Sequence, residues 1–356
     1  MATDEESTGL VQYRCEMCNA PYPLGADDVI STCPYCGYTF TVGGSEMKEH
    51  LLLSNKLTQD EVKKVVADWL HFAASKSVGT RFTREIEIGT PSLQWIPTFR
   101  VNAQCDTYHF GANQKGSGNN KRWEKVEVRE SQQTTEWVLA RRHAATFGIK
   151  ELIESLDDSG AQPFDIKHTA QATVLNSEIG ENDAPVRARH QKAQRDRTDL
   201  NQKVTKLLDY RLDMTADACN YVHAPYWLVR YEHRGGTFRV AVSGATGKVV
   251  LGELPVTKRY RVKNWLLSFF MLIGSALLFQ GTPYITYAIF SGGSSDGDAA
   301  LIPIAMIAIG GILFVAAYMY VGKALGYEIE LTADAKERQK PFSFTGSIKG
   351  LEEKVR

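Results

Sequence analysis

Two long runs of uncharged, mostly apolar residues constrain the fold of this 356-residue chain more than any other feature. They cover residues 264–290 and 300–321, and neither contains Asp, Glu, Lys or Arg. Each run is close to the roughly 20 residues that a helix needs to cross the hydrocarbon core of a bilayer. A buried helix of a soluble protein would explain one run, but two runs joined by a short polar segment favour membrane insertion. The sequence therefore predicts two transmembrane helices, 264–290 and 300–321, connected by an external loop at 291–299.

The charges around these runs predict their orientation. The loop at 291–299 carries two aspartates and no cation, whereas cations gather at the other ends of the runs, at Lys258, Arg259, Arg261, Lys263 and Lys323. Because Lys and Arg concentrate on the cytoplasmic side, we expect a multi-pass protein of the cell (inner) membrane with both termini cytoplasmic, including a cytosolic tail at 322–356. Ionisable groups inside a span mark transport pathways, and these runs have none. We therefore interpret the hairpin as an anchor in the lipid bilayer.

The N-terminal region holds two Cys-x-x-Cys pairs, Cys15/Cys18 and Cys33/Cys36. The chain opens with acidic and polar residues and not with the cationic and apolar segments of a secretory signal. We therefore expect residues 1–10 to form a disordered tail in the cytosol. In a reducing compartment, paired motifs of this kind favour a metal ion over disulfides.

Two such pairs supply four thiolates, the ligand set that suits tetrahedral Zn²⁺. The spacing predicts a zinc ribbon at 11–45 with one structural zinc ion as its cofactor. The predicted metal ligands are Cys15, Cys18, Cys33 and Cys36. Four protein ligands leave no open position for water, and so small a ribbon depends on its metal for folding energy. A redox dithiol and an iron–sulfur or rubredoxin-like iron site are the alternatives.

Residues 46–256 are predicted to form an α+β cytosolic region rich in antiparallel strands. A capping box at residues 58–61 opens an amphipathic helix that extends to about Ser75. Strand patterns follow at 84–88 and from residue 93, and the Gly- and Asn-rich stretch at 111–120 is predicted to be a loop. Two further strands, 237–242 and 248–251, are expected to form a meander. Similar aromatic and proline residues near positions 95 and 225 are consistent with a duplicated β unit.

A helical insert at about 180–215 divides this region, and charge separates along the chain around it. Residues 151–183 are mostly acidic, whereas residues 187–206 are rich in Lys and Arg. We interpret the basic helix as a solvated face that leans on the acidic stretch. A contact surface for acidic lipid headgroups, RNA or a partner protein is the alternative. The predicted fold class is thus α+β, with an N-terminal zinc ribbon, an antiparallel β-rich middle region with a helical insert, and a C-terminal transmembrane helical hairpin.

No catalytic constellation is evident in the sequence. The segment 243–248 lacks the spacing of a phosphate-binding loop and is interpreted as a hairpin turn. Because nucleophile elbows, zinc-protease helices and dinucleotide fingerprints are also missing, the chain is not expected to be an enzyme. Its 41 basic and 41 acidic residues argue against nucleic acid as a partner. Cys105 with His109, and Cys219 with His223, are candidates for a second metal site, although two buried thiols are the simpler interpretation.

These motifs, in this order, resemble a known family: the TFIIB-type zinc-ribbon-containing membrane proteins of bacteria and archaea. Some of its members carry the label of a primosomal or superfamily II helicase-like protein, which the missing phosphate loop contradicts. The resemblance extends over most of the chain, with Ser243 in place of a frequent Asn or Asp. It rests on the four ribbon cysteines with Cys33-Pro34-Tyr35-Cys36-Gly37, and on Trp95-Ile96-Pro97, Arg122-Trp123, Pro225-Tyr226-Trp227, Tyr231 and the turn at 243–248.

The resemblance implies a role in recruitment. Relatives look like membrane partners of phage-shock-type coat proteins and flotillin-like proteins in envelope-stress systems. The expected function is therefore a membrane-anchored cytosolic adaptor that recruits or scaffolds such proteins at the inner membrane surface. A membrane-tethered nucleic-acid-binding protein, or an accessory subunit of a membrane enzyme or transporter, is the alternative. The oligomeric state is left open.

Overall fold

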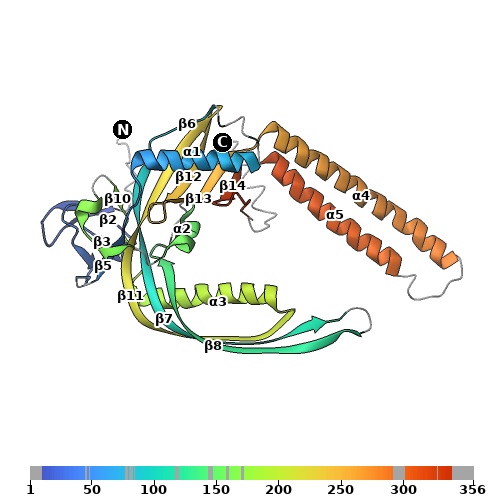
Figure 1. The fold of residues 1–356 in the computed structure, drawn as a ribbon, viewed down its shortest axis with the longest axis horizontal. Helices are drawn as coiled ribbons and strands as arrows, with labels where there is room; N and C mark the ends of the chain where they lie inside the picture. Colours follow the sequence, from blue (N-terminus) through green and yellow to red (C-terminus); the bar gives the residue numbers. More distant parts are fainter. Residues whose placement is uncertain are drawn as a thin grey trace, which may run out of the picture. The chain divides into compact units, whose positions relative to one another are not determined.

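The protein is a mixture of strands and helices (Figure 1), and it divides into two compact units. The computed structural model describes residues 10–338 except 45, 48, 77–78, 80–82, 84, 117–119, 143–146, 158–159, 170–171, 292–300 and 327. Unit 1 comprises Met1–Val66, Gly89–Arg230 and Arg239–Val250, and unit 2 comprises Ala67–Ile88, Tyr231–Phe238 and Leu251–Arg356. The predicted tail at 1–10 lies outside the described residues except for Leu10, as do most of the 291–299 loop and the end of the 322–356 tail.

The N-terminal region of unit 1 consists of two short antiparallel hairpins. Strand β1 (Leu10–Arg14) pairs with β2 (Pro21–Gly25), and β3 (Ile30–Thr32) pairs with β4 (Thr39–Thr41). Their shared core is small: among the residues whose burial is described, its buried members are Cys15, Tyr22, Leu24, Cys33 and Phe40. A core of this size buries little apolar surface, so a further source of stability is needed.

Three very long strands form the curled antiparallel sheet of unit 1: β7 (Ser92–Lys115), β8 (Arg122–Leu139) and β11 (Lys206–His233). Strand β7 lies between the other two, paired from Thr98 to Lys115 with β8 and from Trp95 to Ala112 with β11. Register shifts interrupt the β7–β11 ladder at Leu207/Asp209 and Ala216/Ala218. Such bulges bend a strand and increase its twist, which agrees with the strong curvature of these strands in Figure 1.

The loop predicted at 111–120 begins too early, because β7 continues to Lys115 before the connection to β8, which begins at Arg122. Gly111 provides the physical reason. A Cβ atom at this position would lie 2.6 Å from Val204 Cγ1 and 2.7 Å from the carbonyl oxygen of Lys206. The glycine therefore allows two backbones to approach closely within the ladder, and it does not mark a turn.

Shorter strands extend the sheet at both ends, and the order of the principal strands is β10-β7-β11-β12-β13-β14. The predicted meander is confirmed by β12 and β13, but only two residues of the strand predicted at 84–88 are described as strand. Within the segment predicted as the cytosolic tail at 322–356, β14 pairs with β13 from Leu251↔Thr332 to Pro255↔Glu328. The remaining strands are β5 (His50–Leu53), β6 (Glu87–Ile88), β9 (Ala161–Pro163), β10 (Thr173–Val174), β12 (Gly236–Ser243), β13 (Lys248–Pro255) and β14 (Glu328–Thr332).

Helix α3 (Ala184–Lys203) lies along the concave side of the long strands (Figure 1). Ala184 and Ala188 are buried on one face, in the same cluster as Phe99 of β7. Their small side chains allow the helix to approach the sheet closely, although the rest of its surface is polar. The helical insert predicted at about 180–215 is therefore shorter than expected, because strand pairing with β7 begins at Lys206. The other short helices of unit 1 are α2 (Ile149–Ser155), η3 (Ile166–Thr169) and η4 (Glu181–Asp183).

Helix α1 (Gln59–Lys76) confirms the predicted amphipathic helix and its capping box. The Glu61 carboxylate accepts hydrogen bonds from the Thr58 backbone N–H at 2.8 Å and hydroxyl at 2.9 Å. In unit 2 the indole of Trp69 lies directly over Gly252 of β13, where a Cβ atom would meet ring carbons at 2.2 and 2.3 Å. The indole N–H also donates to the Ala333 carbonyl at 3.1 Å. Gly252 is thus required by the packing of α1 on the sheet.

We expect Gly252→Ala to lower the free energy of unfolding by about 1–3 kcal/mol, the usual effect of overpacking a filled core. The added methyl group would overlap the Trp69 ring, which its bond to Ala333 holds in place. Chemical denaturation of the detergent-solubilised protein measures this change. Gly180→Ala is the matched control, because its new Cβ would meet only Val29 Cγ1, at 3.8 Å. Equal stability of the two variants would contradict this packing.

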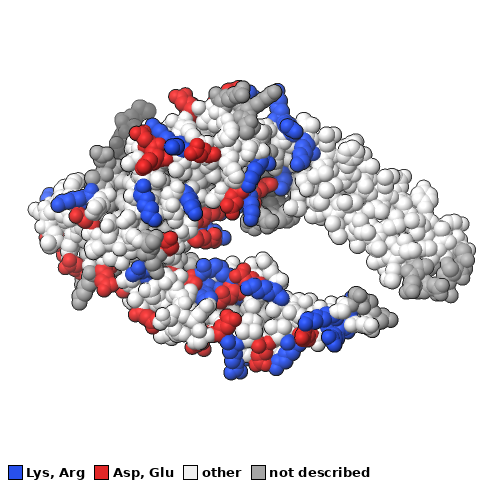
Figure 2. Space-filling view, in the orientation of Figure 1, with Lys and Arg blue, Asp and Glu red and all other residues white. Residues whose placement is uncertain are grey.

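The C-terminal part of unit 2 contains two antiparallel neighbours, α4 (Lys258–Ser291) and α5 (Leu301–Leu325), both long and apolar enough to span a membrane. They begin and end within a few residues of the predicted runs, except that α4 starts six residues earlier, after Thr257. Ser268 and Ser275 of α4 donate hydrogen bonds to the carbonyls of Ala317 and Gly310, at 3.0 and 2.9 Å. Beyond its charged base, the described surface of this hairpin carries no Lys, Arg, Asp or Glu side chains (Figure 2).

Candidate metal centre

The four predicted metal ligands meet in one cluster at the turns of the two N-terminal hairpins. Cys15 and Cys18 lie between β1 and β2, and Cys33 and Cys36 lie between β3 and β4. Their sulfur atoms all lie within 4.8 Å of one another. The Sγ atoms of Cys15 and Cys36 are 3.6 Å apart, and those of Cys18 and Cys33 are 3.7 Å apart. Within the described part of the chain, no other group of three or more His, Cys, Asp or Glu side chains could hold a metal ion.

These distances fit a tetrahedral metal ion. At a metal–sulfur distance of about 2.3 Å, the edge of the tetrahedron is about 3.8 Å long. The observed 3.6 and 3.7 Å separations are close to this value. The four cysteines can therefore hold one metal ion.

The backbone forms the same knuckle at each cysteine pair. The residue after each second cysteine, Asn19 or Gly37, has a left-handed conformation with φ of 59° or 77°. The N–H of Asn19 donates to the Cys15 carbonyl at 2.8 Å, and that of Gly37 donates to the Cys33 carbonyl at 2.9 Å. Glycine and asparagine tolerate this conformation better than other residues do. Gly37 is the glycine that ends the second Cys-x-x-Cys motif in the sequence, whereas Asn19 has no comparable signal there.

The knuckles also direct amide N–H groups at sulfur. Burial raises the pKa of the Cys15 thiol, but hydrogen bonds from the amides of Cys18 and Met17 outweigh burial and lower it to about 7. Burial raises the pKa of Cys36 to about 12, and neighbouring thiols reinforce this shift. Four adjacent thiols cannot all ionise without a cation among them. The cluster is therefore suited to binding a metal ion through thiolates.

A buried histidine pair connects the second knuckle to the sheet. His50 Nε2 lies 2.7 Å from His223 Nδ1, and His50 Nδ1 lies 2.8 Å from the Thr39 hydroxyl. His223 Nε2 donates to the Leu175 carbonyl, at 2.9 Å. A neutral imidazole has one N–H donor and one acceptor nitrogen. Because His223 donates from Nε2, its Nδ1 accepts the proton of His50 Nε2–H, and His50 Nδ1 accepts a hydrogen bond from the Thr39 hydroxyl. The phenyl ring of Phe164 stacks on His50 with a centroid separation of 3.9 Å.

The pair also removes His223 from the second metal site that the sequence analysis considered. Cys219 donates to the Glu181 carbonyl, at 3.8 Å, and Cys105 is buried beside Ala103 and Leu212. Neither thiol joins a set of three potential ligands among the described residues. The interpretation of Cys105 as a buried thiol is confirmed, while Cys219 is only partly buried.

The histidine pair predicts that stability declines in mild acid. Burial lowers the pKa of His50 to about 2 and that of His223 to about 4. Because histidine in the unfolded chain titrates near 6.5, the unfolded state takes up these protons first. The free energy of unfolding should fall below pH 6.5 by about 1.4 kcal/mol per pH unit for each proton. Urea unfolding between pH 7.5 and 4.5 measures this slope.

The double variant His50→Gln/His223→Gln should have a shallower dependence on pH. Thiolates of the cysteine cluster also titrate, but they contribute equally to both proteins. His190→Gln is the control, because His190 is exposed on α3. An unchanged slope in the double variant would show that the pair does not carry the acid sensitivity.

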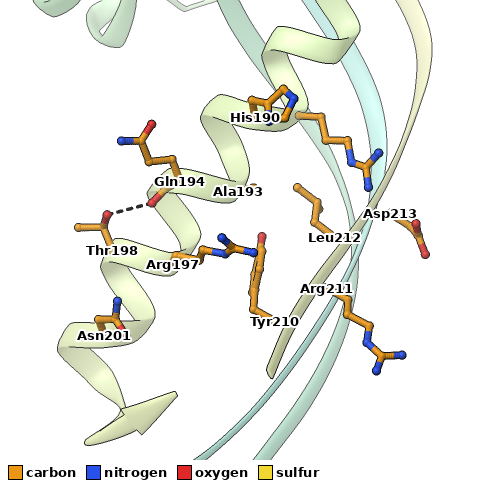
Figure 3. A pocket seen from close by; sticks show the side chains of 11 residues that line it. His190, Ala193, Gln194, Arg197, Thr198, Asn201, Tyr210, Arg211, Leu212 and Asp213 are labelled. Atoms are coloured by element: carbon orange, nitrogen blue, oxygen red, sulfur yellow. Dashed lines mark hydrogen bonds between the residues drawn. The ribbon is translucent and has the colours of Figure 1, made fainter. Parts of the chain in front are cut away.

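A basic groove runs between α3 and β11 (Figure 3). Its cavity volume is about 960 Å³. Arg197 lies 5.4 Å from the centroid of the Tyr210 ring, and the Tyr210 hydroxyl donates to Asp196 at 2.8 Å. The cationic side chains that line it are Arg189, Arg197 and Arg211, with His190 beside them.

The basic helix was interpreted as leaning on the acidic stretch at 151–183. The ion pairs described for α3 go elsewhere: Lys192 pairs with Asp196 within the helix, and Arg195 pairs with Glu136 of β8. Glu178, from the acidic stretch, pairs with Arg141. The three arginines of the groove are exposed, and Arg211 pairs with Asp209 of its own strand at 3.1 Å.

No family model, curated protein or solved structure matches this chain. Its class is defined by its own features: a mixed α+β fold with an antiparallel curled sheet, a four-cysteine cluster near the N-terminus, and two apolar C-terminal helices of membrane-spanning length. The family resemblance drawn from short motifs stays a prediction.

Proposed function

We propose that this chain is a membrane-anchored adaptor whose zinc-bound N-terminal head docks a cytosolic protein. The proposal combines three features: a site of four thiolates, an exposed surface on the two cysteine knuckles that form this site, and a hairpin of two apolar helices. Anchoring raises the local concentration of whatever the head binds. The family resemblance would make the partner a phage-shock-type or flotillin-like protein in envelope stress.

The metal in this proposal is zinc with a structural role. Zn²⁺ favours tetrahedral thiolate sites, and four thiolates leave no position at which water could be activated. The cytosolic side follows from the cations that flank the two helices and from the anionic loop between them. No residue of the site is then needed for catalysis, in keeping with an adaptor.

The observation that carries the proposal is the pair of exposed apolar side chains on the two knuckles. Met17 is 70% exposed and Tyr35 is 63% exposed, and each immediately precedes a cysteine of the cluster. A bound metal would hold both knuckles rigid and keep these side chains in solvent. Rigid, exposed aromatic and methionine side chains are typical anchors of protein interfaces. We therefore place the docking surface at Met17 and Tyr35.

Crosslinking in intact cells, followed by capture of the full-length chain from detergent, tests this surface. The double variant Met17→Ser/Tyr35→Ser should keep the bound zinc. The amount of partner protein that it captures should fall about tenfold or more, since each interface anchor contributes about 1–2 kcal/mol of binding free energy. Val186→Ser/Leu208→Ser is the matched control, because these side chains are 56% and 54% exposed away from the knuckles. Equal capture by both double variants would exclude the knuckles as the docking surface.

One observation favours a second candidate function, binding of nucleic acid by the tethered head. The groove beside α3 presents Arg189, Arg197 and Arg211 together with Tyr210. Binding through phosphates should weaken steeply as salt rises. Arg189→Gln/Arg197→Gln should then reduce both the affinity for single-stranded RNA and its salt slope. A flat response to RNA and DNA at low salt would exclude this function.

A further inference from the structure

The start of α4 has a charge arrangement that a simple anchor does not require. Its first two turns carry Lys258, Arg259, Arg261 and Lys263, and its first turn has no acidic residue. The N-terminus of a helix has a partial positive charge, so cations are unfavourable there and anions are favourable. This end of α4 would therefore be stabilised by an anion held beside it.

A groove within unit 2 lies at this position. It has a cavity volume of about 470 Å³ and is lined by residues of α1, α4 and β14, with Lys76, Arg259 and Lys263 as its cations. Among the described residues that line it, the one carboxylate is Glu337, which pairs with Lys323 at 2.9 Å. Within the part of the chain that the structure describes, neither an ion pair nor any other polar contact neutralises Arg259 or Lys263. The groove thus keeps a net positive charge.

Apolar surface adjoins these cations on α4. Val262, Trp265 and Leu266 are 57%, 48% and 52% exposed. Figure 2 shows charged side chains at the base of the hairpin and none along its described length. A free phosphate ion would use the cations alone. A phospholipid would use both features, with its phosphate at the cations and its acyl chains along the apolar face.

We propose that this groove binds the phosphate of one anionic phospholipid headgroup. The Arg259 guanidinium can donate two parallel hydrogen bonds to phosphate oxygens, and the Lys263 ammonium adds a compact charge. The site rests on the proposed anchoring of α4 and α5 in a bilayer, which brings its first turns to headgroup level. It deepens that function by giving the anchor a preference among lipids.

Native mass spectrometry of the full-length chain in detergent tests the site, with phosphatidylglycerol, phosphatidylcholine and inorganic phosphate as probes. We expect bound phosphatidylglycerol in preference to phosphatidylcholine. Arg259→Gln/Lys263→Gln should weaken phosphatidylglycerol binding about 10- to 30-fold, since a cation near an anionic lipid contributes about 1 kcal/mol. The control Lys258→Gln/Arg261→Gln removes the same charge from exposed residues of the same helix that do not line the groove, and should change binding less than about twofold.

Equal weakening by the two double variants would overturn the proposal in favour of diffuse surface charge. Displacement of phosphatidylglycerol by millimolar inorganic phosphate would overturn the lipid assignment in favour of a free phosphate site. Resistance of each protein to extraction from membranes by alkaline carbonate is measured in parallel. Variants that stay in the membrane but lose the lipid preference support the headgroup site, whereas a wild-type chain that is extracted refutes the anchor itself.

Discussion

Replacing Cys36 by serine should abolish metal binding and unfold the two N-terminal hairpins. Because Cys36 is exposed, a serine hydroxyl at this position disturbs no packing. Any unfolding of the hairpins in this variant would therefore result from the loss of one metal ligand. Structural zinc contributes about 10–16 kcal/mol of apparent folding free energy in small zinc domains. The buried core of these hairpins has five members, of which two are the ligands Cys15 and Cys33. Little apolar packing would remain to hold the segment without the metal.

Elemental analysis and limited proteolysis of the purified full-length chain measure both effects. We expect about one zinc ion per wild-type chain and almost none in Cys36→Ser, with rapid cleavage between residues 10 and 42. Cys219→Ser is the control, because it removes a partly buried thiol from β11 and leaves the cluster intact. Iron in place of zinc would overturn the metal assignment. A protease-resistant N-terminal segment without any metal would overturn the structural role.

The double variant Leu277→Arg/Ile312→Arg should prevent stable insertion of the helical hairpin. Both side chains point away from the partner helix, with 64% and 68% exposure. In water such outward positions would accept arginine with little change. Inside a bilayer each arginine near a helix centre costs about 2.5–3.5 kcal/mol, and the two together about 5–7 kcal/mol. The effect therefore depends entirely on whether lipid covers these positions.

The fraction of protein that resists alkaline extraction from membranes measures insertion. Leu208→Arg is the matched control, because Leu208 is 54% exposed on β11, outside the hairpin. The control should stay in the membrane fraction, and the double variant should be extracted or degraded. Full retention of Leu277→Arg/Ile312→Arg would mean that α4 and α5 do not span a membrane.

Several elements could be predicted from the sequence because their causes are local. The capping box at Thr58 and Glu61 acts within one helical turn, and its hydrogen bonds form as expected. Each cysteine knuckle is likewise a five-residue unit. The full lengths of β7 and β11 could not be predicted, because Gly111 lies in a stretch whose composition is typical of a loop. Only its close approach to residues 204–206 shows why it lies in a strand.

The histidine pair and the groove at α4 could not be found from sequence patterns. His50 and His223 are 173 positions apart, and no periodicity links them. The groove brings Lys76, Arg259 and Glu337 together from three separate segments. Strand β14 could not be predicted for a similar reason, because its five residues form a strand by pairing with β13, which is distant in the sequence.

The spacing of the thiols predicts the four-cysteine cluster, and the absence of charge over about 20 residues predicts the two apolar helices, because both signals act through local chemistry. The contacts of the histidine pair, the position of α3 and the set of cations that line one groove follow from the tertiary structure alone. Those contacts depend on strand register between segments more than a hundred residues apart. Register is set by side-chain packing across the sheet, and no short stretch of sequence contains both sides of that packing.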